Sequence, residues 1–526
     1  MKPIAAIKMS ALFVMLMTLL FGCQEKENTG KGQDLQPELR LESTLYKVAA
    51  QSGQCEIPYT LQHPAQDCQL VVQTSAEWVT STEVQQDKVL VKVAENSGRV
   101  PRSTVLTLSY GELTAEVNLL QFEMTRRYDV FPMYADEDIP YRIPAVAVTK
   151  SGTVLAVADY RHSRADIGVV NNGRIDLHMN RSFDDGVTWE GVSTIIEGQG
   201  AASSDFMNVG YGDPCIVADR ESDRVLMLSC AGNVSYPNGT RDNHQNIARF
   251  YSEDGGLTWG KPDDIAESIY SQFDDCSQGP AQAMFVASGK ILQSRFVKTG
   301  DYYRLYCAVL LRNKNGVPTN YVLYSDDFGG VWRVLGDPDR PAVRNTCDEP
   351  KVEELPDGSV LISSRWEGGR YYNIYNFSNP ETAAGTWQQA AFSGKPNGGV
   401  EAQANSTNGE ILSVPAIRMA DGQKVDLLLQ SVPLGPGRKN VGIYYKALEQ
   451  ASDYASPKAI ARDWEGVYQV TYLNSAYSTM VQQHDGRIAF LWEETTYCSD
   501  GGGYTIAYDC YALERITSGK YSLSVE

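Results

Sequence analysis

The sequence predicts an all-β protein in which a small Ig-like β-sandwich precedes a six-bladed β-propeller. Residues 38–123 contain short alternating segments with no helical period, which is typical of a β-sandwich. Residues 127–526 contain a strand–turn–strand unit that recurs six times at intervals of about 67 residues, the size of a four-stranded blade with its loops. A chain of 526 residues is also too long for one compact core.

The first region shows the twofold alternation of half-buried strands. Val89, Val91 and Val93 alternate with Leu90 and Lys92. Because successive side chains of a strand point to opposite faces, this pattern places the valines on one face. The region carries no catalytic motif, so we expect a spacer, with glycan binding as the alternative.

In the second region, the unit that recurs is a pair of apolar runs separated by turn residues. Such turns define hairpins, and six hairpins in sequence predict six blades. The six turns are Ser151-Gly152, Ser222-Asp223, Ser288-Gly289, Asp357-Gly358, Asp421-Gly422 and Asp485-Gly486.

A second repeat runs in phase with the hairpins. The pattern S-x-D-x-G-x-T-W of the Asp box occurs at Ser182–Trp189 and Ser252–Trp259, and at Ser325–Trp332 with Val331 in place of Thr. An Asp side chain can accept backbone N–H groups across a tight turn, Gly allows positive φ, and Trp packs between strands. We therefore expect these repeats to be structural; a fourth copy near Ser378–Trp387 is degenerate.

The N-terminus has the features of a targeting segment. Lys2 and Lys8 lead into the apolar run Met9–Phe21, which is short for a membrane span but suits a signal peptide. The ending Leu-Phe-Gly-Cys at Cys23 resembles the lipobox of bacterial lipoproteins, which implies a signal peptide over 1–22, lipidation of Cys23, and a polar tether over 23–37. The alternative is a plain secretory peptide with a chance cysteine.

Charge and cysteine usage exclude several classes of function. A formal net charge of -19 argues against a nucleic-acid partner. The cysteines form no CxxC motif and the five histidines are scattered, so no metal or cofactor is expected. In an exported chain, Cys55 with Cys68 and Cys498 with Cys510 either form disulfides or remain free thiols.

Polar side chains gather at the end of each hairpin that lies far from its turn. Residues equally distant from a turn face each other, and a propeller brings equivalent strand ends together around one funnel. Asp166 and Arg438 lie in loops that emerge at the same end. Alone, an Arg–Glu pair at a sheet end is usually a solvated ion pair, but convergence favours a site. The facing pairs are Glu349 with Arg365, Tyr477 with Glu493, and Arg142 with Arg161.

From Arg127 to the C-terminus the chain resembles the bacterial exo-α-sialidase family. The resemblance rests on Tyr141-Arg142-Ile143-Pro144, the Asp boxes, the spacing of Glu349 and Arg365, and Ser475-Ala476-Tyr477-Ser478 followed by Leu491-Trp492-Glu493. The preceding segment resembles a BACON module through its strand pattern and Trp78-Val79.

This resemblance implies a role for each candidate residue. Tyr477 is the nucleophile, Glu349 its base, and Asp166 the acid and base. Arg142, Arg365 and Arg438 grip the sugar carboxylate, Glu493 orients Arg142, and Arg161 belongs to the binding site. The chemistry is consistent, because sialic acid carries a carboxylate on its anomeric carbon, which disfavours a second carboxylate as nucleophile.

We therefore expect retaining hydrolysis of terminal sialic acid from glycoconjugates. The partners are sialylated glycans, with the membrane contacted only through the lipid anchor. The expected location is the outer membrane, at the cell surface or in the periplasm. The alternatives are a glycan-binding propeller without turnover and a relative that transfers sialic acid or forms an anhydro product.

Overall fold

The computed structural model describes residues 36–65, 67–133, 141–403, 406–495 and 503–524. The expected signal peptide and the lipidation site Cys23 lie outside these residues, as does nearly all of the tether. No helix among the described residues is long and apolar enough to span a membrane. The described chain is nearly all β, with three short α-helices at α1 (Ala266–Tyr270), α2 (Pro457–Ile460) and α3 (Leu513–Ile516).

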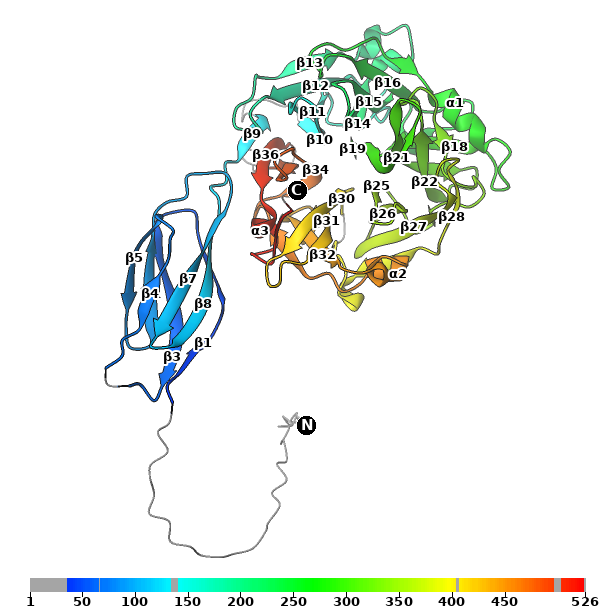
Figure 1. The fold of residues 1–526 in the computed structure, drawn as a ribbon. Helices are drawn as coiled ribbons and strands as arrows, with labels where there is room; N and C mark the ends of the chain where they lie inside the picture. Colours follow the sequence, from blue (N-terminus) through cyan, green and yellow to red (C-terminus); the bar gives the residue numbers. More distant parts are fainter. Residues whose placement is uncertain (1–35, 66, 134–140, 404–405, 496–502, 525–526) are drawn as a thin grey trace, which may run out of the picture.

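The first region folds into two four-stranded sheets around one apolar core (Figure 1). Val89, Val91 and Val93 are buried in this core, on the side that the alternation predicts. One sheet has the order β1 (Glu38–Leu41), β3 (Gly53–Gln62), β6 (Lys88–Val93), β5 (Val79–Val84). The other has the order β2 (Leu45–Val48), β8 (Leu113–Gln121), β7 (Arg102–Tyr110), β4 (Val71–Gln73).

Six further sheets surround a common axis in the described chain after Arg127 (Figure 1). The first contains β10 (Tyr141–Val148), β11 (Val154–Arg161), β12 (Ile175–Ser182) and β13 (Ser193–Ile196). The second contains β14 (Tyr211–Ala218), β15 (Val225–Ala231), β16 (Asn246–Ser252), β17 (Asp263–Asp264) and β19 (Gly289–Lys290). The third contains β18 (Ala281–Val286), β20 (Leu292–Thr299), β21 (Tyr302–Asn313), β22 (Pro318–Ser325), β23 (Arg333–Val334) and β24 (Val343–Arg344).

The last three sheets complete the ring. The fourth contains β25 (Pro350–Glu354), β26 (Val360–Trp366), β27 (Gly369–Asn379), β28 (Ala384–Trp387) and β29 (Ala391–Gly394). The fifth contains β30 (Ile411–Arg418), β31 (Lys424–Pro433), β32 (Val441–Leu448), β33 (Gly466–Gln469) and β37 (Tyr521–Leu523). The sixth contains β34 (Ser475–Gln482), β35 (Ile488–Glu494), β36 (Thr505–Tyr511) and β9 (Tyr128–Phe131), so a strand from before the ring completes its last sheet.

Five of the six expected turns join paired strands, but Ser288-Gly289 does not. β18 and β20 pair one after the other with the same strand, β21, so together they form one interrupted strand. The interruption arises because β19, which contains Gly289, pairs in parallel with β14 of the preceding sheet. The hairpin turn of the third sheet instead lies at Gly300 and Asp301, between β20 and β21.

The three Ser-x-Asp repeats close the turns between the third and fourth strands of their sheets. In each repeat the Asp side chain accepts a hydrogen bond of 2.8 Å from the backbone N–H four residues later. The Ser hydroxyl accepts another, also of 2.8 Å, from a Gly in the left-handed region. The aspartates are Asp184, Asp254 and Asp327, and the glycines are Gly186, Gly256 and Gly329.

The sandwich contacts the sixth sheet and its neighbouring segments. Arg515, in α3, donates to the Glu123 carboxylate over 2.6 Å. Arg487 donates to the backbone carbonyl of Arg99 over 3.3 Å, and Arg99 donates to the carbonyl of Asp185 over 3.5 Å. The first region is therefore joined to the part of the ring that β9 closes.

Cys55 and Cys68 do not form a disulfide. Cys55 lies in β3 opposite Val91 and is buried in the sandwich core, whereas Cys68 is exposed. The two cysteines therefore do not face each other across a hairpin. Cys510 is a buried free thiol, and Cys498 lies outside the described residues.

We predict that Asp254→Ala lowers the free energy of unfolding by about 1–3 kcal/mol, because three groups of its turn lose an acceptor. Glu253→Ala is the matched control, since its side chain makes only an exposed ion pair with Arg224, worth about 0–1 kcal/mol. Urea unfolding followed by tryptophan fluorescence measures both, and equal costs would contradict a structural role for the repeat.

Candidate active site

A buried carboxylate joins the first sheet to the last. The Glu493 side chain on β35 is fully buried and accepts hydrogen bonds from Arg142 Nε over 2.8 Å and from the Ile143 backbone N–H over 2.8 Å. It also accepts the Tyr477 backbone N–H over 3.1 Å. Ile143 has a φ of 54° and is followed by Pro144, which places a bulge beside Arg142. Glu493 therefore fixes Arg142 and the backbone of Tyr477 with one group.

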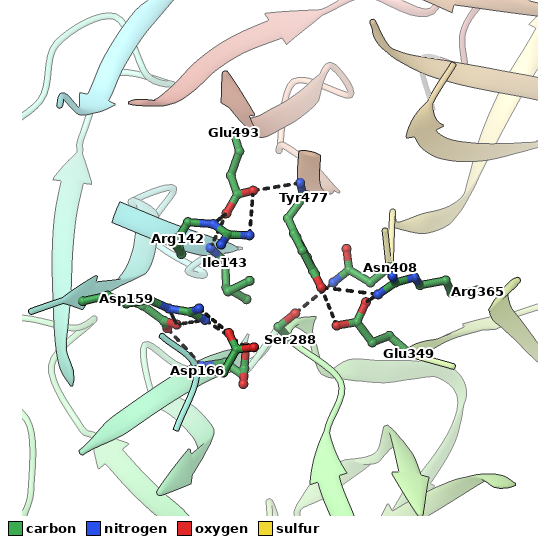
Figure 2. Close-up of polar contacts among 12 residues, drawn as sticks. Arg142, Ile143, Asp159, Asp166, Ser288, Glu349, Arg365, Asn408, Tyr477 and Glu493 are labelled. Atoms are coloured by element: carbon green, nitrogen blue, oxygen red, sulfur yellow. Dashed lines mark hydrogen bonds and ion pairs between the residues drawn. The ribbon is translucent and has the colours of Figure 1, made fainter. Parts of the chain in front are cut away.

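The Tyr477 hydroxyl lies against a carboxylate. Its oxygen is 2.6 Å from Glu349 Oε1, and Arg365 donates to Glu349 Oε2 over 2.8 Å and to the Tyr477 oxygen over 3.5 Å (Figure 2). Burial raises the pKa of Tyr477 well above its ordinary value, Glu349 raises it further, and Arg365 and Arg438 oppose the shift. The phenol is thus protonated in the free protein, with its proton directed at a base.

Two of the three expected strand pairings place the residues as the hairpin geometry predicts. The Arg365 backbone N–H donates to the Glu349 carbonyl over 3.1 Å, and the Tyr477 N–H meets the Glu493 side chain. The third pairing is wrong, because Arg142 faces Asp159 and not Arg161. The hairpin is centred on Ser151, where Val148 pairs with Val154, and the bulge after Arg142 shifts the register by one more residue.

Arg161 is surrounded by carboxylates. It is 1% exposed, donates to Asp159 Oδ2 over 3.0 and 2.8 Å, and forms an ion pair with Asp166. The Asp166 side chain is 71% exposed, on the loop after β11. Burial raises the pKa of Asp166, but the charges of Arg161, Arg142 and Arg438 outweigh it, and the pKa lies below its ordinary value. Asp166 is therefore ionised in the free protein and must gain a proton before it can act as an acid.

Arg438 reaches the same place from the loop after β31. Its guanidinium carbon lies 5.5 Å from the centre of the Tyr477 ring, and that of Arg142 lies 5.6 Å from it. The Arg438 carbonyl accepts the backbone N–H of Ser475, at the start of β34, over 3.0 Å. Arg142, Arg365 and Arg438 therefore converge on Tyr477 from three sheets.

These side chains line one cavity of about 340 Å³. Six of the eight expected site residues face it, and Arg161 and Glu493 stand behind as supports for them. Apolar side chains also line the cavity. The six are Arg142, Asp166, Glu349, Arg365, Arg438 and Tyr477, and the apolar lining includes Ile167, Val169, Tyr236, Pro237, Phe285 and Leu310.

Two acidic residues of the cavity were not expected from the sequence. Asp348 lies 3.4 Å from Arg365, and Asp213 lies 3.6 Å from Arg161. A signal for Asp213 was present, because Tyr211-Gly212-Asp213-Pro214 repeats the arrangement of Tyr141-Arg142-Ile143-Pro144. Asp213 has a φ of 51° and a bulge at the equivalent place. No group of three or more potential metal ligands occurs among the residues that the structure describes.

Parts of the chain are similar in sequence to known sialidases. No family model matches the chain. The chain is 30% identical over 253 residues to a sialidase of Micromonospora viridifaciens, and the aligned region covers 44% of the chain and 35% of that protein. It is 24% identical over 241 residues to a sialidase of Bacteroides fragilis, which covers 44% of the chain and 40% of that protein. The matched regions thus span less than half of each relative.

Solved structures show the same fold. A Hadza microbial sialidase superimposes with a TM-score of 0.58 at 19% identity, covering 82% of the chain and 77% of that protein. An intramolecular trans-sialidase of Ruminococcus gnavus gives a TM-score of 0.54 at 18% identity, covering 74% and 98%. The chain therefore has the fold of solved sialidases and is similar in sequence to curated sialidases over part of its length.

We predict that Glu493→Gln lowers the free energy of unfolding by about 3–5 kcal/mol, because it leaves Arg142 without its buried counter-charge. The matched control is the neighbouring Glu494→Gln, whose partner Arg127 is 34% exposed and can be hydrated instead. Chemical denaturation of both variants tests this, and a cost of about 1 kcal/mol or less for Glu493→Gln would contradict the dependence of Arg142 on Glu493.

Proposed function

We propose that the chain is an exo-α-sialidase, which hydrolyses terminal sialic acid from glycoconjugates with net retention through a tyrosyl intermediate. The carrying observation is the contact of 2.6 Å between the Tyr477 hydroxyl and Glu349, inside a cavity that three arginines share. The proposal interprets the six sheets as the blades of a six-bladed propeller. The two sequence relatives described above support it, since both are named sialidases.

The arginines suit a carboxylate ligand. A planar guanidinium presents paired donors that match the two oxygens of a carboxylate, and several guanidinium groups on one anion give strong charge-assisted binding. Arg142 and Arg365 are each held by a carboxylate, Glu493 or Glu349, so their planes are fixed before a ligand arrives. In this role they place the anomeric carbon of a sialoside next to the Tyr477 oxygen.

Tyr477 then acts as a neutral nucleophile. As its oxygen attacks the anomeric carbon, its proton passes to Glu349, and the C–O bond to the leaving sugar breaks. A neutral phenol avoids the repulsion that an attacking carboxylate would meet from the substrate carboxylate. Arg365 contacts both Glu349 and the phenol oxygen, so it stabilises the negative charge while the proton moves between them.

Asp166 supplies the acid and base steps. Asp166 first takes up a proton from the solvent and donates it to the departing sugar oxygen. As a carboxylate it then removes a proton from the water that cleaves the tyrosyl–sugar bond, so configuration is retained overall. Its exposed side chain at the cavity supports this role, since both a leaving sugar and water can reach it there.

The remaining assignments concern the rest of the chain. The Ser-x-Asp repeats are Asp boxes, and the first region is a BACON-like spacer. The chain is exported and lipidated at Cys23, which attaches it to the outer membrane by its tether. Its partners are sialylated glycans, and its net charge of -19 disfavours nucleic acid.

We predict that Tyr477→Phe lowers kcat/KM on sialosides by at least about 10³-fold, as expected when a nucleophile that acts together with its base is lost. A fluorinated sialosyl donor should label Tyr477 in the parent protein, as peptide mass spectrometry will show. Tyr504→Phe is the matched control, since its ring also lies against Arg142 but has no role as nucleophile.

If the donor labels Glu349 and the Tyr477→Phe variant stays active, the assignment of Tyr477 as nucleophile is wrong. Nuclear magnetic resonance of the first-formed product should show free sialic acid with retained configuration. If the main product is an anhydro sugar or a sialylated acceptor, the chain catalyses transfer and not hydrolysis.

We predict that Asp166→Asn slows cleavage of a sialyl-galactose bond by about 10²- to 10⁴-fold, because that leaving group needs a proton. An aryl sialoside leaves without one, so the tyrosyl intermediate should accumulate after a burst of phenol, and azide should restore turnover. Asp348→Asn is the matched control, another carboxylate of the cavity that should affect both substrates alike. Equal losses on both substrates for Asp166→Asn, without burst or rescue, would assign the acid elsewhere.

A further inference from the structure

The carboxylates around Arg161 outnumber the positive charge that they share. Asp159, Asp166 and Asp213 all lie within ion-pair distance of this one guanidinium group. Arg161 and Asp159 are fully enclosed, and the Asp213 side chain is 18% exposed. If all three carboxylates were ionised, the cluster would carry a net charge of about −2, which a poorly hydrated site disfavours.

The three carboxyl groups are not equally compensated. Asp159 accepts two hydrogen bonds from Arg161 and the backbone N–H of Asp213 over 2.9 Å. Asp166 contacts Nη1 of Arg161 and is open to water. Among the described residues, Asp213 has only an ion-pair contact of 3.6 Å to Nη2, the nitrogen that already donates to Asp159. Asp213 is therefore the least stabilised of the three as an anion.

The other titratable groups near Asp213 do not supply the missing charge. Its own strand, β14, holds it in a bulge with a φ of 51°, so it cannot turn away without changing the backbone. The groups that act on it most strongly are Asp159 and Arg161 on β11, Asp166 on the following loop, and Glu349 before β25. Among the described residues, Arg161 is the only cation within ion-pair distance of Asp213. Arg142, on the adjacent strand β10, is already paired with Glu493.

We propose that Asp213 is a neutral carboxylic acid in the resting protein and acts as a positioning residue, leaving the charge of Arg161 to Asp159 and Asp166. The protonation state is inferred from the cluster alone, and only its effect on catalysis rests on the proposed function. Asp213 and Asp166 contact the two terminal nitrogens of the same guanidinium group. A proton on Asp213 therefore keeps the Asp166 carboxylate in place at the cavity edge.

The direction of the titration follows from these charges. Burial raises the pKa of Asp213 well above its ordinary value, Asp159, Asp166 and Glu349 add to the shift, and Arg161 opposes it. Below this raised pKa Asp213 is neutral. Above it, the new anion competes with Asp159 for Nη2 of Arg161. The guanidinium group then turns away from Asp166, and catalysis declines on the alkaline side.

Infrared spectroscopy of the whole protein tests the protonation state without any substrate. The parent-minus-Asp213→Asn difference spectrum at neutral pH should contain the C=O stretch of a carboxylic acid. The matched Asp159→Asn difference should contain carboxylate bands, since burial raises the pKa of Asp159 only to about 6. Carboxylate bands in the Asp213→Asn difference would overturn the proposal. If that variant does not fold, carbon-13 NMR titration of aspartate-labelled parent protein decides instead. The proposal is refuted if every buried aspartate is ionised at pH 7.

The pH profile of kcat/KM on an aryl sialoside tests the effect on catalysis. Asp213→Asn should remove or displace the alkaline limb, whereas loss of a merely structural residue would lower the whole curve and leave the limb in place. An unmoved limb overturns the positioning role. If the acid band is present but the parent protein cleaves no sialoside at any pH, the proposed function fails and the protonation assignment stands.

Discussion

The four hydrogen bonds that Glu493 accepts determine how the ring closes and where its chemistry lies. The chain has to bring its sixth sheet back to its first, and a buried anion at that seam is stable only if donors from both sides compensate it. The first sheet supplies the Arg142 side chain and the Ile143 N–H, and the sixth supplies the N–H of Tyr477. Closure of the ring and placement of the candidate nucleophile are therefore one event.

The charges around the cavity also follow the rule that a buried charge needs a compensating partner. Two of the arginines that face the cavity are compensated by carboxylates, Arg365 by Glu349 and Arg142 by Glu493. Each retains part of its guanidinium group toward the cavity. Compensation of this kind keeps long side chains in one orientation, so an anionic ligand meets donors that need not reorganise.

Local patterns in the sequence predicted most of the arrangement, because a tight turn fixes which residues of a hairpin face each other. Glu349 with Arg365 is such a case. The prediction was wrong where the pairing is irregular, since a bulge at Ile143 or an interrupted strand at Gly289 depends on the neighbouring sheet and leaves no mark in a twofold pattern. Asp213 was overlooked although its Tyr-x-x-Pro setting repeats that of Ile143, because its contact with Arg161 is made to another sheet.

The strand β9 has a mechanical consequence. It joins the sandwich to the ring and also forms the outer strand of the sixth sheet, paired with β36 through only a few residues. A pulling force that enters from the N-terminal side reaches β9 before it reaches any hairpin of the ring, and the contacts of Arg515 and Arg99 carry part of that load. Tension along the chain would thus open the ring at the sheet that holds Tyr477. A loss of activity under a pulling force would then show that β9 has separated from β36.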